Sequence, residues 1–259
     1  MFSKSVWKMS IIPAAALVLI AAAAPGASAD ERQRNLWWQN SNGTTGQSSG
    51  TVDRTRGHTE GTMTGSTSNG RGWTRSYDRK YDPSTHSWTS TNEVTTNSGK
   101  TYTRTNSGSC EKGSGCTSNG TFTDANGQTI TRDSSTKATG NGGWETNRTW
   151  TGENGNTATY NGTGQATGNG GWTSNGTYTG PNGNTATRTA NGQVNDNGWN
   201  KTTTTTGSNG QTYTRNSTGQ YEGNGTASSD VTWTGPNGNT TESQRWIQVQ
   251  PGQPAQPTQ

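Results

Sequence analysis

The chain has few of the residues that build a hydrophobic core. Only 22% of its 259 residues are hydrophobic, whereas ordinary domains are roughly 45–50% apolar with glycine included. Beyond residue 29, Leu, Ile, Val and Phe together number nine. This shortage excludes an ordinary globular interior and would be typical of disorder. Ten tryptophans and seven tyrosines remain in the same region, and their regular spacing argues for an ordered chain.

Residues that carry out chemistry are also scarce. The two histidines, His58 and His86, lie in irregular N-terminal parts of the chain, and the carboxylates recur at no fixed place. No G-x-S-x-G motif occurs, and Asn/Asp-Gly loops are better explained as turns than as calcium ligands. The sequence therefore predicts no enzyme, no metal site and no cofactor. The formal net charge of +4 is too small to indicate a nucleic acid or lipid partner.

The first 29 residues have the features of a secretory signal peptide. Lys4 and Lys8 precede an apolar run over 11–24, and the small residues Ala27 and Ala29 form a cleavage site. An uncleaved anchor is the alternative, although the run is short for a membrane span. We expect a secreted or cell-surface protein, with the periplasm as an alternative. No other stretch could cross a membrane as a helix, and neither face of the expected strands supplies the apolar band that an outer-membrane barrel needs. The prediction therefore includes no integral membrane segment after cleavage.

A repeat of about 28 residues fills most of the chain. Its turn phrase, T-G-P-N-G-N-T, occurs at residues 179–185 and 234–240. A fixed period of this size is typical of repeat architectures. The glycines that keep the period are Gly99, Gly127, Gly155, Gly183, Gly210 and Gly238. The predicted organisation is a signal peptide (1–29), a low-complexity segment (30–60), a β-repeat region (61–246) and a Pro/Gln tail (247–259), with both mature ends disordered.

The pattern of each repeat unit predicts two strands joined by a tight turn. Thr177 and Thr179 alternate with Tyr178, which is a strand pattern. The segment 180–183, Gly-Pro-Asn-Gly, predicts a three-residue hairpin loop with a glycine bulge. That register pairs large residues with small or medium ones: Tyr178 with Ala186, Trp150 with Ala158, Phe122 with Ile130, Val94 with Tyr102, and Thr205 with Tyr213.

The predicted fold class is therefore an all-β repeat, either an antiparallel meander or a stacked two-layer β-solenoid. One face carries threonine, and the other carries a thin aromatic layer that replaces the missing core. We assign the layer to Trp88, Trp144, Trp150, Trp172, Tyr178, Trp199, Tyr213 and Trp233. Cys110 occupies a column that holds Ala, Val or Tyr in other units, and Cys116 occupies a column that holds Trp. A disulfide between the two is the simplest expectation. Free thiols and bonds between chains are the alternatives.

Arginine is the one charged residue that recurs within the unit. Arg75, Arg104, Arg132, Arg188 and Arg215 close the phrase T-x-T-R, and the strand pattern places Arg188 on the aromatic face. The simpler interpretation is a side-chain stem packed on Trp or Tyr with its head in solvent. The functional interpretation is a ladder for anionic or sugar ligands.

The repeated phrase resembles the T-G-P-N-G-x-T-x-T-R repeats of uncharacterised secreted bacterial proteins. More loosely, the step Gly183-Asn184-Thr185-Ala186 is similar to the repeats of curlin-type functional amyloids, although the regularly placed curlin glutamine does not match. This resemblance implies matrix or fibre function and covers about residues 61–242.

The hypothesis from the sequence is a secreted, self-assembling structural protein of the bacterial surface or extracellular matrix. Short β-units with exposed strand edges favour pairing with further copies. The alternative is a surface adhesin that binds glycans through Trp and Tyr ladders, and ice binding through Thr-x-Thr ranks is a weaker one. Expected partners are further copies, surface or matrix components and polysaccharide.

Overall fold

The computed structural model describes residues 30–223 and 225–251, all but a few of them in strands and short turns. The predicted signal peptide and most of the predicted tail lie outside these residues. Sixteen strands follow one another along the chain: β1 (Asp30–Asn40), β2 (Thr45–Thr55), β3 (His58–Thr67), β4 (Gly72–Asp82), β5 (Ser87–Thr96), β6 (Thr101–Glu111), β7 (Gly115–Thr123), β8 (Thr129–Gly140), β9 (Gly143–Gly152), β10 (Thr157–Gly168), β11 (Gly171–Thr179), β12 (Thr185–Asn195), β13 (Gly198–Gly207), β14 (Thr212–Gly223), β15 (Thr226–Thr234) and β16 (Thr240–Pro251).

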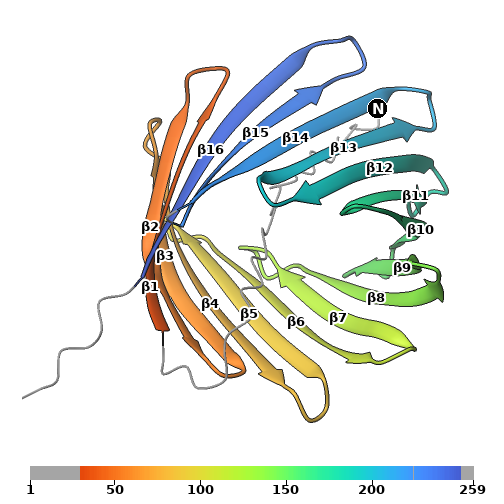
Figure 1. The fold of residues 1–259 in the computed structure, drawn as a ribbon, viewed down its shortest axis with the longest axis horizontal. Helices are drawn as coiled ribbons and strands as arrows, with labels where there is room; N and C mark the ends of the chain where they lie inside the picture. Colours follow the sequence, from red (N-terminus) through yellow and green to blue (C-terminus); the bar gives the residue numbers. More distant parts are fainter. Residues whose placement is uncertain (1–29, 224, 252–259) are drawn as a thin grey trace, which may run out of the picture.

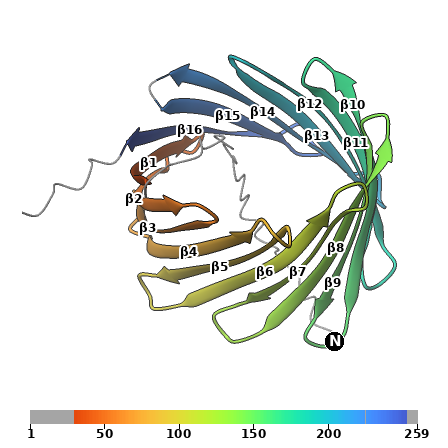
Figure 2. The same cartoon turned by 60° about the horizontal axis from the view of Figure 1, so that its bottom comes forward.

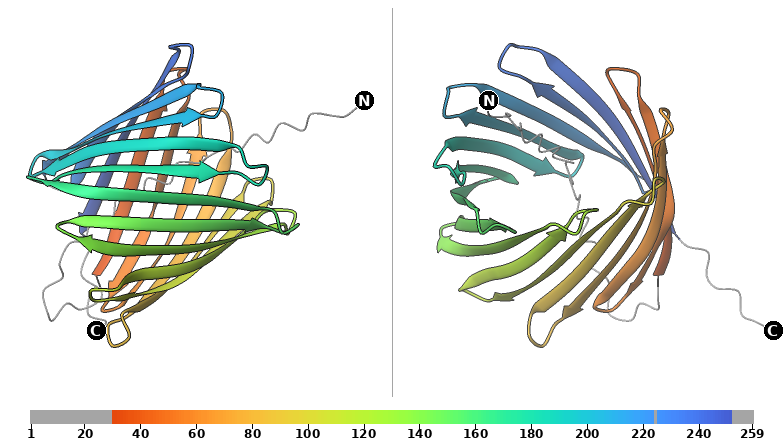
Figure 3. Two further views of the ribbon diagram at one scale, coloured as in Figure 1. Left: turned by 90° about the vertical axis from the view of Figure 1, so that its right-hand side faces the viewer. Right: turned by 180° about the vertical axis from the view of Figure 1, so that it is seen from behind.

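The strands form one closed antiparallel barrel. Each strand pairs with its neighbours in sequence, and β1 pairs with β16 to close the wall, as Figures 1 and 2 show. Figure 3 shows the strands slanting across the wall with the turns at its two rims. The predicted open meander or two-layer solenoid is therefore wrong. A local repeat specifies hairpins, but closure depends on twist and stagger summed over all sixteen strands.

The barrel extends beyond both ends of the predicted repeat region. Residues 30–60 form β1, β2 and the start of β3 in the same sheet as the repeats. At the other end, β16 continues to Pro251 and pairs with β1 over nine residue pairs, from Arg32↔Pro251 to Asn40↔Ser243. Both ends of the described chain are therefore part of the barrel wall, and the repeat boundaries at 61 and 246 do not coincide with a structural break.

The turns at one rim have the predicted geometry. In the β11–β12 turn, the Gly183 N–H donates to the Gly180 carbonyl, and the Gly180 N–H donates to the Asn184 carbonyl at 2.8 Å. Gly183 has a φ of +76°, and the other five period-keeping glycines have φ between +75° and +82°, a region in which a Cβ is strained. All five predicted cross-strand pairs, including Tyr178↔Ala186, are confirmed.

Most turns at the other rim are shorter. Asn141–Gly142 and Asn169–Gly170 link their strands with positive φ at both residues, which is the two-residue hairpin that matches the twist of the strands. Cys110 and Cys116 face each other at this rim, across the β6–β7 turn, and form a disulfide.

Burial alternates along β2, β3 and β12 and identifies the inner face of the wall. In β3, Met63 is 7% exposed, while Thr62 and Thr64 on the opposite face are exposed. Side chains inside a cylinder converge and those outside spread apart, so the more buried set faces inward. A Cβ added to Gly50 of this set would overlap the Thr62 carbonyl of the next strand. The wall thus bends sharply toward this face, as expected on the inside of a barrel.

Most inward tryptophans lie over a glycine directly across the ladder. Six pairs share this arrangement: Trp38/Gly46, Trp73/Gly65, Trp88/Gly108, Trp144/Gly164, Trp172/Gly192 and Trp199/Gly219. In each pair the indole occupies the space that a side chain on the glycine would need. Tryptophan therefore supplies the contact surface that the glycine lacks, an arrangement known to stabilise glycine-containing strands.

Candidate functional site

The basic side chains of the strands line the inside of the barrel. The strand registers place twelve of them on the inner face: Arg32, Arg34, Arg54, Arg75, Arg79, Arg104, Arg132, Arg148, Arg188, Lys201, Arg215 and Arg245. Only Lys80 and Lys137 of the strands carry a basic group on the outer face.

The carboxylates lie on the opposite face. Those on paired strand positions with described side chains all point outward: Glu31, Asp53, Glu60, Asp78, Asp82, Glu93, Glu111, Asp133, Glu145, Asp230 and Glu242. A wall with cations on one side and anions on the other creates a positive potential inside, and a low-dielectric wall focuses that potential. The small net charge of the chain hides this separation.

The arginines of the T-x-T-R phrase occupy one level of the inner wall. Each is the fourth residue of its strand, in β4, β6, β8, β12 and β14. Because these strands all start at the rim with the longer turns, the five side chains form an incomplete ring at a constant depth below that rim. We name this set the arginine ring: Arg75, Arg104, Arg132, Arg188 and Arg215.

Aromatic faces hold several of these cations in place. The Arg215 guanidinium carbon lies 5.2 Å from the centre of the Trp233 ring, and the Lys201 ammonium lies 5.2 Å from that of Trp172. Arg148 lies 5.8 Å from Tyr160 in the same way. Such contacts fix the stem of a cation without neutralising its charge, so the charged heads keep their ability to bind an anion.

Two inward asparagines accept hydrogen bonds from the ring. Asn92 accepts from Arg75 Nε at 3.2 Å, and Asn106 accepts from Arg104 Nε and from Arg132 Nη2 at 3.3 Å each. An amide oxygen orients a guanidinium but carries no negative charge. Among the described residues, the buried Nε atoms of Arg132 and Arg215 make no hydrogen bond. Buried donors are normally satisfied, so these two atoms are exceptions on the inner wall.

The interior is open to water. Val194 and Tyr213 on the inner face, each beside a strand end, are 50% and 49% exposed. Arg75 and Arg104, which lie further from the rim on the same face, are exposed as well. Sixteen strands form the size class that leaves an aqueous channel, whereas eight-stranded barrels are filled by side chains. The inner surface is therefore a water-accessible wall of aromatic and cationic side chains.

The sequence-predicted site residues separate into three groups. The aromatic-layer residues Trp88, Trp144, Trp150, Trp172, Tyr178, Trp199, Tyr213 and Trp233 all face inward. The period-keeping glycines form turns at one rim, and the cysteines lie at the other. The sequence analysis missed the inward cations outside the T-x-T-R phrase: Arg32, Arg34, Arg54, Arg79, Arg148, Lys201 and Arg245. All of these but Arg54 and Arg245 carried a positional signal, because each lies an even number of residues from an inward aromatic of its own strand.

The structural hypothesis of a self-assembling matrix or amyloid-like biofilm protein is wrong. Assembly through strand edges needs free edges, and a closed barrel pairs every strand on both sides. The adhesin alternative, with Trp and Tyr ladders on a solvent-facing surface, is wrong as well, because these aromatics line the inside of a closed barrel. The Thr-x-Thr ranks invoked for ice binding lie on a curved outer wall. The exclusion of a membrane segment is also overturned. It rested on the lack of a second spanning helix and on the lack of an apolar band on either face of the strands, but a closed barrel is the form in which a sheet can cross a membrane.

No helix long and apolar enough to cross a membrane occurs within residues 30–223 and 225–251.

Among the comparisons with known proteins, the one with solved structures bears on the fold. No protein-family model matches the chain, and no curated protein matches it. Among solved structures, a triple mutant and a double mutant of Rh. blastica porin are each similar with a TM-score of 0.50 and 9% sequence identity. The likeness covers 86% of this chain and 99% of each porin chain. The chain therefore shares the barrel fold of these porins.

Proposed function

We propose that the barrel is a porin-like channel that admits anionic solutes to a cationic, water-filled interior. The observation that carries this proposal is the separation of charge across the wall. Twelve basic side chains face inward, and every paired carboxylate with a described side chain faces outward. Cations in a confined space attract anions and repel cations at long range, and an arginine guanidinium binds carboxylate or phosphate through paired hydrogen bonds.

A channel of this kind would act in an outer membrane, which is a cell-surface location. The secretory signal over 1–29 is compatible with export to that membrane. The proposal assigns the chain no catalytic residue and no cofactor. Its selectivity filter would be the arginine ring, because five guanidinium groups share one level of the wall and lie close to the entrance at one rim.

The outer wall favours a second candidate, a water-soluble barrel that binds anions without crossing a membrane. Lipid-facing barrel strands carry an apolar band flanked by aromatic girdles. Here the outward positions are mainly Thr, Ser, Asn and Gln with the carboxylates, and the large apolar side chains among them are Trp37 and Trp246. Both candidates have the same cationic interior. They differ in whether the outer wall contacts lipid or water.

Single-channel recording in planar lipid bilayers tests the channel. Refolded chain 30–259 is added to one side, and the reversal potential is measured across a tenfold KCl gradient. The channel account expects discrete conductance steps and a reversal potential whose sign reports chloride as the main carrier. No steps, together with failure to float with liposomes in a density gradient, would reject the channel and leave the soluble barrel. Steps carried mainly by potassium would reject both candidates.

Paired variants identify the residues responsible. Arg132→Gln/Arg188→Gln removes two charges from the arginine ring, and Lys80→Gln/Lys137→Gln removes two from the outer wall. The first pair should shift the reversal potential toward zero, because fewer interior cations attract chloride. The second pair should leave it unchanged, since these groups face away from the lumen. Equal shifts in both pairs would show that net charge, rather than the interior, sets the selectivity.

A further inference from the structure

We propose that His58, Glu60 and Asp78 form a zinc-binding site on the outer wall of the barrel. This inference is independent of the proposed channel, since the three residues face away from the interior. They lie at the rim that holds the β2–β3 turn and the two ends of the described chain.

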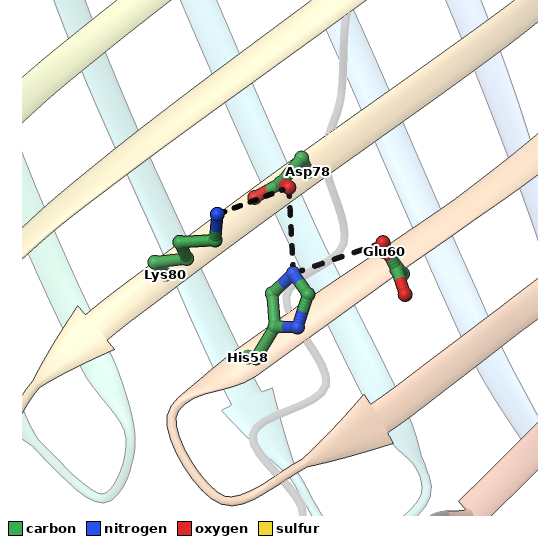
Figure 4. Close-up of polar contacts among 4 residues, drawn as sticks. All are labelled: His58, Glu60, Asp78 and Lys80. Atoms are coloured by element: carbon green, nitrogen blue, oxygen red, sulfur yellow. Dashed lines mark ion pairs between the residues drawn. The ribbon is translucent and has the colours of Figure 1, made fainter.

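The strand geometry brings the three side chains together. His58 and Glu60 are two residues apart on β3 and therefore share its outer face. Asp78 on β4 is directly opposite Glu60 in the ladder, and Lys80 is opposite His58. Figure 4 shows the His58 ring nitrogen directed between the two carboxylates, with Lys80 reaching Asp78 from the other direction.

The distances suit a tetrahedral ion. His58 Nε2 lies 3.4 Å from Asp78 Oδ2 and 3.8 Å from Glu60 Oε2, and the three ligand atoms all lie within 4.8 Å of one another. A tetrahedral zinc ion with bonds of about 2.0–2.1 Å holds its ligand atoms about 3.3 Å apart. Small rotations of the three side chains would therefore complete three bonds to zinc. Because the site is half-buried, a water molecule can supply the fourth ligand.

The ring nitrogen of His58 faces both carboxylates. His58 Nε2 is buried and makes no hydrogen bond to the described residues, although two carboxylate oxygens lie within 3.8 Å. An imidazole nitrogen together with two carboxylate oxygens is a ligand set that suits zinc. A hard ion such as calcium or magnesium prefers oxygen ligands alone.

The surrounding charges favour a cation at this position. Asp53 on β2 is directly opposite Glu60, so three carboxylates form a row across β2, β3 and β4. Like charges directly opposite one another destabilise a sheet. Lys80 offsets part of this repulsion with Nζ 3.7 Å from Asp78 Oδ2, but its side chain is largely exposed and such a pair contributes little. A divalent ion would offset more of it and would join β3 to β4.

Zinc titration of the folded chain 30–259 tests the site, with Zn²⁺ alone as the ligand and a chromophoric chelator as competitor. The expected result is one equivalent of bound zinc that excess Mg²⁺ and Ca²⁺ do not displace, together with a zinc-dependent rise in the unfolding temperature. His58→Asn and Asp78→Asn should each weaken binding by roughly tenfold or more. His86→Asn is the matched control, because the other histidine lies in the β4–β5 turn outside this cluster, and its affinity should equal that of the parent chain.

A variant that is expected to bind zinc more tightly separates an effect on the site from a folding defect, because misfolding would weaken binding. Lys80→Gln removes the cation that competes for Asp78, and zinc should then bind roughly two- to fivefold more tightly. Circular dichroism confirms that each variant is folded before titration. The proposal is overturned if the parent chain binds no zinc, if His58→Asn binds as the parent does, or if Mg²⁺ displaces the ion.

Discussion

Trp144 covers Gly164 on the neighbouring strand, and its indole occupies the space into which a side chain on Gly164 would project. The same relationship recurs in five other strand pairs of the inner wall. It explains how a chain with nine aliphatic or Phe residues beyond residue 29 builds an ordered sheet. Each tryptophan contributes a large contact area, and each glycine makes room for it.

Replacing Gly164 with alanine should destabilise the barrel. The added methyl group would overlap Trp144 and force the indole out of position, and overpacking of this kind costs about 1–3 kcal/mol. Gly152→Ala is the matched control, since its new methyl group would meet only Asn156 O at 3.7 Å and should change the free energy of unfolding by less than about 0.5 kcal/mol. Urea unfolding followed by tryptophan fluorescence measures both. Equal losses in the two variants would show that the Trp–Gly contact has no special role.

Removing β16 should convert the barrel into an aggregating sheet. A chain that ends at Asn239 leaves β1 and β15 with unpaired edges, which are templates for pairing with other copies. A chain that ends at Pro251 is the control and should behave as the full chain does. Analytical ultracentrifugation of both refolded chains reports the outcome. A monomeric, β-structured chain ending at Asn239 would show that closure between β1 and β16 does not protect the sheet.

The hairpins could be predicted from the sequence because their determinants are local. The Gly-Pro-Asn-Gly segment fixes the turn, the turn fixes the register, and the register fixes pairs such as Tyr178 with Ala186. The separation of a threonine face from an aromatic face followed from the same alternation. Closure could not be predicted in this way, because the residue pattern of a single hairpin does not determine whether β16 pairs with β1.

The candidate interior was only partly visible in the sequence. The T-x-T-R phrase identified the arginine ring, but Arg148 and Lys201 belong to no recurring phrase. The carboxylates looked scattered along the chain, and only the pairing of β2, β3 and β4 aligns Asp53, Glu60 and Asp78. The segment 30–60 was predicted to be disordered because it lacks the repeat, yet its small inward residues, such as Gly46 and Ser48, pack beneath larger neighbours.

The central claim is that the inside of this barrel is cationic, and tryptophan quenching by small ions tests it most directly. Trp37→Phe/Trp246→Phe removes the two outward tryptophans, so that the remaining fluorescence reports the inner wall. Iodide and caesium are then compared as quenchers at low ionic strength, each normalised to free N-acetyltryptophanamide. The account predicts that iodide quenches more strongly than caesium, and that the difference shrinks in Arg132→Gln/Arg188→Gln and at high salt, where charges are screened. Equal quenching by the two ions, or stronger quenching by caesium, would contradict it.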